Sequence, residues 1–147
     1  MKKLLIIIIC CLNFNHLSAQ KYITDYINDA NKLSLQWWEQ INSGKYKLAY
    51  NSLSEELKKR FSNESWLSQI SILMDEFGKL ENRTVKDTYF KSQLEGFEDG
   101  FYVIIKYDVR YSKTKNHTEY IILKQNDKLK WVIFDFSYEF QNINDSE

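Results

Sequence analysis

The 147-residue sequence contains no proline and only four glycines. The absence of proline means that no helix or strand is interrupted by a residue without a backbone N–H. The few glycines are scattered, so the chain has no glycine-rich loop of the kind that binds phosphate groups. The sequence also has no internal repeat and no low-complexity stretch, which is typical of one compact domain.

Cysteine and histidine are scarce. Cys10 and Cys11 both lie in the first twenty residues, and His117 is the one histidine beyond them. Residues 21–147 therefore offer no disulfide, no thiolate nucleophile and no cysteine-based metal site. A Ser-His-Asp site would depend on His117, which we interpret as a solvated residue at the mouth of a hairpin. We expect no metal, no cofactor and no catalytic residue set.

No excess charge of either sign is present, since 20 basic residues balance 20 acidic residues. Loss of Lys2 and Lys3 would leave 18 basic residues and a net charge of −2. This balance gives no bulk electrostatic attraction for nucleic acid or for an anionic membrane. We therefore expect neither as a partner.

The first twenty residues have the three parts of a secretory signal peptide. Met1-Lys2-Lys3 is basic, Leu4 to Leu12 is apolar, and Ser18-Ala19-Gln20 supplies small residues. A membrane anchor is the alternative, but the apolar run ends after about half of the roughly 20 residues that an anchor needs. A lipid-modified Cys10 is disfavoured because an isoleucine precedes it. We expect cleavage near Ala19-Gln20 and export to the periplasm or the medium.

Apolar residues recur at helical spacing in the first half of the chain. The first stripe, which predicts a helix capped at Thr24 or Asp25 and ended by Gly44, consists of Tyr26, Ala30, Leu33, Trp37 and Ile41. Residues 46–61 continue the period, and Ser54 as an N-cap divides them into two short pieces. A further helix is predicted from Ser62 or Asn63 to Gly78.

After Gly78 the apolar period changes to two. Strands are predicted over residues 80–92, 101–112, 117–125 and 129–139, with a tight turn at 125–128. One face of the second strand is apolar from Phe101 to Tyr111. The expected fold class is α+β: three N-terminal helices packed on a curved four-stranded antiparallel sheet. The expected organisation is a signal peptide at 1–20, one domain at 22–140 and a polar tail at 141–147.

A series of short marks in the same order resembles the bacterial domain-of-unknown-function family 4019. They are Trp37, Gly44-Lys45-Tyr46, Tyr50, Trp66, Gly78, Arg83, Gly96, Asp99-Gly100, Tyr102, residues 119–123 (Glu-Tyr-Ile-Ile-Leu) and Trp131. The likeness covers residues from about 30 to 138. It implies a cone-like fold similar to nuclear transport factor 2 and the cystatins, and a location in the cell envelope. It implies no activity.

One polar pair is expected among the apolar positions. Glu119 shares a face with Ile121 and Leu123, which should point at the helices, and a buried carboxylate needs a partner. Arg83, on the first strand, is the natural partner because its guanidinium can bind a carboxylate. The candidate pocket comprises Arg83, Glu119, Trp66, Tyr50, Tyr107 and Trp131. The alternative is an ion pair that only fixes the register of the sheet.

Three functions of different classes agree with these features. The first is an exported binding module for a small apolar or aromatic ligand or for an envelope protein, favoured because aromatic residues outnumber catalytic groups. The second is a small isomerase or hydro-lyase that uses a single carboxylate such as Glu119. The third is a structural accessory domain. An open cavity that holds Arg83 and Glu119 would favour the first two, and a filled core would favour the third.

Overall fold

The computed structural model describes residues 2–114 and 117–140, with side chains from residue 21 onward. The predicted polar tail at 141–147 lies outside the described residues. Four helices precede a four-stranded antiparallel sheet with strand order β1-β2-β3-β4. The predicted α+β class and the order of elements are therefore confirmed. The fold class was stated with three helices and the structure has four, because the two short pieces predicted on either side of Ser54 are the separate helices α2 and α3.

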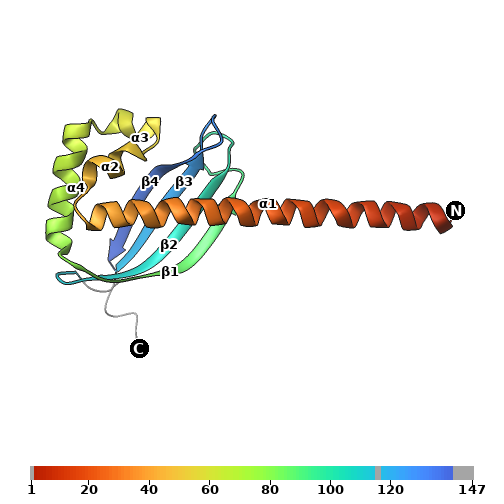
Figure 1. The fold of residues 1–147 in the computed structure, drawn as a ribbon, viewed down its shortest axis with the longest axis horizontal. Helices are drawn as coiled ribbons and strands as arrows, with labels where there is room; N and C mark the ends of the chain where they lie inside the picture. Colours follow the sequence, from red (N-terminus) through yellow and green to blue (C-terminus); the bar gives the residue numbers. More distant parts are fainter. Residues whose placement is uncertain (1, 115–116, 141–147) are drawn as a thin grey trace.

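The helix α1 spans Lys2–Asn42 and lies across one face of the sheet, with its N-terminal part extending beyond the rest of the molecule (Figure 1). The predicted start at Thr24 or Asp25 is wrong, since both residues lie inside this helix. A capping residue favours a helix start but does not impose one, and residues 2–42 contain no proline or glycine to interrupt the helix. The helix ends before Gly44, which has the expected positive φ of 71°.

Of the remaining helices, α3 and α4 begin where their capping residues predict. α2 spans Tyr46–Asn51 and α3 spans Glu55–Arg60, and the Ser54 side chain accepts a hydrogen bond from the Leu57 amide. α4 spans Asn63–Phe77, with Ser62 accepting from the Ser65 amide and Gly78 following the last turn. These three helices lie together at one end of the sheet (Figure 1).

The strands are β1 (Leu80–Lys91), β2 (Tyr102–Tyr111), β3 (His117–Gln125) and β4 (Trp131–Phe140). Alternation along β2 is as predicted, because Val103, Ile105, Tyr107, Val109 and Tyr111 are buried. Phe101, which precedes the strand, is 40% exposed. The turn between β3 and β4 is longer than expected, since the Asn126 amide donates to the Lys130 carbonyl oxygen.

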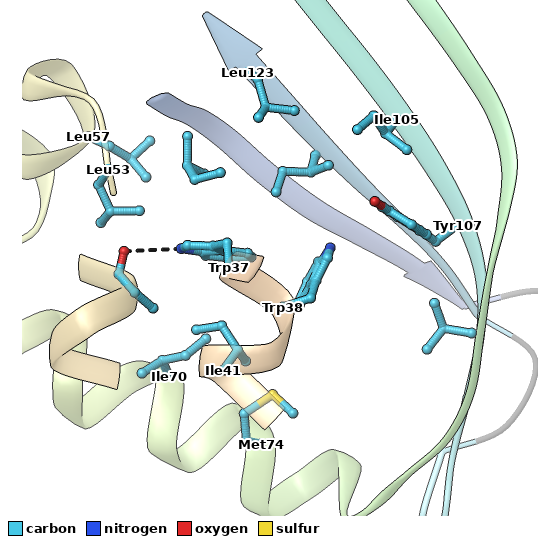
Figure 2. Packing of buried hydrophobic residues seen from close by; sticks show 14 of the residues in the cluster. Trp37, Trp38, Ile41, Leu53, Leu57, Ile70, Met74, Ile105, Tyr107 and Leu123 are labelled. Carbon is cyan, nitrogen blue, oxygen red and sulfur yellow. Dashed lines mark hydrogen bonds between the residues drawn. The ribbon is translucent and has the colours of Figure 1, made fainter. Parts of the chain in front are cut away.

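The core lies between α1, the short helices and the inner face of the sheet (Figure 2). At its centre the indole N–H of Trp37 donates to the carbonyl oxygen of Ala49, 3.1 Å away, which fixes α1 against α2. The ring of Trp37 also contacts the rings of Trp66 and Phe136. Burial of rings of this size contributes most of the apolar area that holds such a core together.

A bulge in β4 carries Phe136 into this core. On β3, Ile122 pairs with Asp135 and Leu123 pairs with Ile133. Phe134 is therefore an extra residue that pairs with no residue of β3. Strict alternation from Trp131 and Ile133 would point Asp135 at the helices. The extra residue reverses that alternation, which places Phe136 among the tryptophans and leaves Asp135 on the other side.

The two edges of the sheet differ. The β4 edge is used by the chain itself, since the Ser54 amide donates to the Ile133 carbonyl and the Ile133 amide donates to the Ser52 carbonyl. β1, the other edge strand, pairs with β2 along one side. Within residues 2–114 and 117–140, no other segment pairs with its second side.

Candidate functional site

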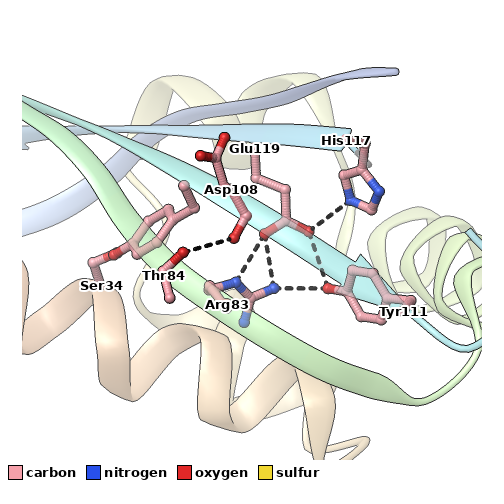
Figure 3. A network of polar contacts seen from close by, with 8 residues as sticks. Ser34, Arg83, Thr84, Asp108, Tyr111, His117 and Glu119 are labelled. Carbon is pink, nitrogen blue, oxygen red and sulfur yellow. Dashed lines mark hydrogen bonds and ion pairs between the residues drawn. The ribbon is translucent and has the colours of Figure 1, made fainter. Parts of the chain in front are cut away.

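The structure brings Arg83 of β1 and Glu119 of β3 together across β2 (Figure 3). Nη2 and Nε of Arg83 lie 2.7 and 2.9 Å from Oε2 of Glu119. Both side chains are nearly inaccessible to solvent, with 7% and 2% exposure. One charge-assisted hydrogen bond, from Nε, and one close ion-pair contact, with Nη2, therefore converge on one carboxylate oxygen.

Tyr111 connects the two charged groups. Its hydroxyl accepts a hydrogen bond from Arg83 Nη2 at 2.7 Å and donates to Oε1 of Glu119 at 3.0 Å. Burial raises the pKa of the Tyr111 hydroxyl well above its usual range, and the charge of Glu119 raises it further. The hydroxyl is therefore a fixed neutral donor to the carboxylate.

His117 belongs to the same cluster, which corrects its interpretation as a solvated turn residue. It is the first residue of β3, it is fully buried, and its ring stacks on that of Tyr111. Its Nε2 lies 3.4 Å from Oε1 of Glu119, so Nε2 carries the proton that is donated to the carboxylate. The strand starts at His117, and period-two alternation puts this residue on the same inner face as Glu119.

Both oxygens of Glu119 are thus occupied by donors from the protein. A cavity next to this carboxylate has a volume of about 10 Å³, and it is bordered by Trp38, Met74 and Phe136. Such a cavity holds at most one water molecule. It therefore has no room for a substrate beside Glu119.

Arg83 faces an open groove on its other side. The groove has a volume of about 460 Å³ and lies between α1 and β1; its lining residues are Leu35, Trp38, Glu39, Asn42, Ser43, Leu80, Arg83, Val85 and Tyr107. The guanidinium lies over the Trp38 ring, with 4.0 Å between Cζ and the ring centroid. Most of the lining is apolar or aromatic, and the volume is within the range of small-molecule sites.

Tyr107 closes the inner end of this groove. Its hydroxyl is hydrogen-bonded to the Ser34 hydroxyl of α1 at 2.8 Å, which joins α1 to the middle of the sheet. Burial raises the pKa of Tyr107, while the hydrogen bond with Ser34 acts in the opposite direction. Tyr107 therefore presents a neutral ring to the groove.

The other three candidate residues do not meet this site. Trp66 and Tyr50 lie in the helical layer, where their polar atoms donate to the carbonyl oxygens of Tyr46 and Phe61. Trp131 contacts Tyr26 at the opposite end of β4. Trp131 pairs with Gln125 of β3, which is six residues, or about 20 Å of strand, beyond Glu119. The six candidates are therefore divided among three places.

Trp38, Tyr111 and His117 were not assigned to the site from the sequence. Two signals for them were present: Tyr111 and His117 share their strand faces with Tyr107 and Glu119, respectively. The adjacent Trp37 and Trp38 could stack on a ligand, but the helical spacing favours Trp37 as a core residue and Trp38 as the cover of a core edge. Instead, Trp38 is 95% buried, since Arg83 packs against it.

Among the residues that the structure describes, no group of three His, Cys, Asp or Glu side chains could hold a metal ion. No helix in the described part of the chain is long and apolar enough to cross a membrane.

A family model described as "Protein of unknown function (DUF4019)" matches residues 33–138, the region of the expected resemblance. A crystal structure from Campylobacter jejuni, of a protein described as an NTF2-like transpeptidase, is 14% identical to this chain. The match covers 71% of this chain and 96% of that one, with a TM-score of 0.48. A likeness of this degree says nothing about the activity of this chain. No curated protein matches it.

Proposed function

Because the chain belongs to the DUF4019 family, a family of unknown function, we propose its function from its own geometry. We propose that it is an exported bacterial envelope protein that binds an apolar ligand or partner in the groove between α1 and β1. Export is supported by the basic, apolar and small-residue order of residues 1–20. Binding is supported by the groove.

The observation that carries this proposal is the contrast between the two sides of Arg83. On the inner side, Glu119 is enclosed and hydrogen-bonded by Arg83, Tyr111 and His117. On the outer side, the guanidinium and the Trp38 ring border an open, mainly apolar hollow. A carboxylate base must reach the proton that it removes. This geometry favours binding over catalysis by Glu119.

The experiment is a titration with N-phenyl-1-naphthylamine, whose fluorescence rises in apolar surroundings. Purified protein without residues 1–20 should enhance the fluorescence in a saturable manner. Leu35→Asp should weaken binding at least tenfold because it puts a charge into the groove, where Leu35 is 58% exposed.

The matched control is Ile72→Asp, since Ile72 is 57% exposed on α4 and does not line the groove. This variant should bind the dye like the wild type. Equal loss in both variants, or no saturable binding by the wild type, would refute an apolar site at this groove.

A further inference from the structure

β1 combines an unpaired edge with the apolar groove. The chain covers the opposite edge of the sheet with residues 52–54, whereas no described segment pairs with the second side of β1. An edge strand of this kind presents free N–H and C=O groups that can form a ladder with another chain. Irregularities between Leu80 and Asn82, and between Val85 and Asp87, restrict the regular stretch beside the groove to residues 82–85.

A helical stripe lies alongside this free edge. Leu35, Trp38, Glu39 and Asn42 are spaced by three, one and three residues, so they lie on one side of α1, and all of them line the groove with Leu80, Arg83 and Val85 of β1. A strand added to β1 would continue the sheet beneath this stripe. Its alternate side chains would then point into the groove.

The charges of the groove favour a neutral chain with a basic residue. Arg83 is already neutralised by Glu119, so an acidic ligand would place an uncompensated negative charge beside it. Within the described residues, Nε and Nη2 of Arg83 are hydrogen-bonded and Nη1 has no acceptor (Figure 3). A peptide carbonyl is a neutral acceptor. Glu39, on the rim, makes no ion pair with any described residue.

From the free edge, the overhanging stripe and these charges, we propose that β1 and the groove bind an extended segment of a partner protein as an additional strand. The segment is apolar at alternate positions, which enter the groove, and carries a basic residue opposite Glu39. This inference rests on the proposed function that the groove binds an apolar group. It adds the class of ligand and the backbone ladder that recognises it.

The test uses a fluorescein-labelled peptide, Thr-Val-Thr-Lys-Thr-Val-Thr with a C-terminal amide, and protein without residues 1–20. In this peptide Lys and the two valines share one face, so Lys can reach Glu39 when the valines enter the groove. Fluorescence anisotropy should give saturable binding. Two further peptides keep the same side chains but have every second backbone amide N-methylated, one at the odd positions and the other at the even positions. One of these two peptides should bind at least tenfold more weakly than the parent. The methyl group removes ladder donors without removing apolar area.

Protein variants locate the binding. Leu35→Asp should weaken binding of the peptide at least tenfold, and Ile72→Asp should leave it unchanged. Glu39→Gln should weaken binding of this lysine-containing peptide and not of a peptide with Gln in place of Lys. Melting curves establish that each variant is folded, and the methylated peptides test the ladder on the wild-type protein alone.

The outcomes separate this inference from the proposed function. If both methylated peptides bind as well as the parent, or if the parent does not bind although N-phenyl-1-naphthylamine does, the added strand is refuted and the apolar site stands. If neither probe binds, both proposals fall. If the protein forms a concentration-dependent dimer that Leu35→Asp abolishes and no peptide binds, a second copy occupies the edge and the inference is overturned.

Discussion

Arg83 connects three side chains of the buried cluster. It makes a hydrogen bond and an ion-pair contact with Glu119, a hydrogen bond with Tyr111, and a stacked contact with Trp38. A guanidinium can do this because its donors diverge in one plane while its faces remain free to stack on rings. Lysine, with a single point charge, could not replace these contacts together.

The Arg83–Glu119 pair should behave as a buried ion pair in a double-mutant cycle. Arg83→Met leaves Glu119 buried without its main partner and should lower the free energy of unfolding by about 3 kcal/mol. Glu119→Leu should have a loss of similar size. The double variant should lose less than the sum of the two, because neither charge remains unpaired. The measurement is denaturant unfolding of all four proteins.

Recovery in the double variant should be incomplete, since Tyr111 and His117 also donate to Glu119. Additive losses would mean that the two side chains do not interact in solution.

Tyr111 predicts a specific loss of stability in alkali. Its folded pKa is raised above the unfolded value of 10.0 by burial and by Glu119. Above about pH 10 the unfolded chain therefore loses this proton while the folded chain keeps it, so the unfolded state binds fewer protons and stability falls as the pH rises. Below pH 10 this contribution is fully present. Tyr111→Phe should show a smaller fall than the wild type between about pH 9 and pH 11.

The readout is the change in the urea midpoint with pH for each protein. The hydrogen bonds that Tyr111→Phe lacks lower its midpoint at every pH, so they do not affect this change. Tyr22→Phe, at a position that is 61% exposed, is the control and should follow the wild type. Parallel curves for wild type and Tyr111→Phe would contradict the prediction.

At the scale of the element, the loop between β1 and β2 depends on one glycine. Gly96 has a φ of 82°, whereas Gly100 has no positive φ, and a Cβ there would make only ordinary contacts from 3.6 Å outward. A β-branched residue at positive φ is strained by about 1 kcal/mol or more. We expect Gly96→Val to lower the thermal midpoint and Gly100→Val to have little effect.

The comparison is direct because the two positions share the loop and the substitution. A larger loss in Gly100→Val than in Gly96→Val would mean that contacts, and not backbone conformation, constrain this loop.

The elements also differ in how well the sequence predicts them. The starts of α3 and α4 were predicted because the hydroxyls of Ser54 and Ser62 accept hydrogen bonds from backbone amides three residues later. This capping depends only on neighbouring residues in the sequence. The start of α1 was not, because capping competes with uninterrupted helix propensity. The tertiary contacts of Tyr26 and Ala30 both follow Thr24 and Asp25, so they do not favour one start over the other. The β4 bulge was also missed. It is selected by the fit of Phe136 between Trp37 and Trp66, which are distant in sequence.

At the scale of the whole molecule, the continuous α1 raises the question of which residues remain after the proposed cleavage of the signal peptide. Among the residues whose side chains are described, contacts of α1 with the core begin near Tyr26 and Ile27. We expect intact-mass measurement of periplasmic protein to give a chain that begins at Gln20 or Lys21. The full-length mass in the membrane fraction would instead indicate a retained anchor.

The processed protein should fold as the full chain does, since residues 21–25, the first residues whose side chains are described, are all exposed. Melting of a protein that starts at Lys21 provides the control. A marked loss of its stability would mean that residues before Lys21 contribute to the fold.

By itself, the sequence determined the fold class, the four strands, the helix ends at Gly44 and Gly78 and the closeness of Arg83 to Glu119. These follow from local preferences and from the rule that a carboxylate on an apolar face needs a partner. Only the tertiary structure decided that His117 and Tyr111 complete that pair, that Trp66 and Trp131 lie elsewhere, and that the open groove faces Arg83 and excludes Glu119. Those features depend on which side chains fill the space between α1 and the sheet. Contacts between residues that are far apart in the sequence leave no periodic pattern from which they could be predicted.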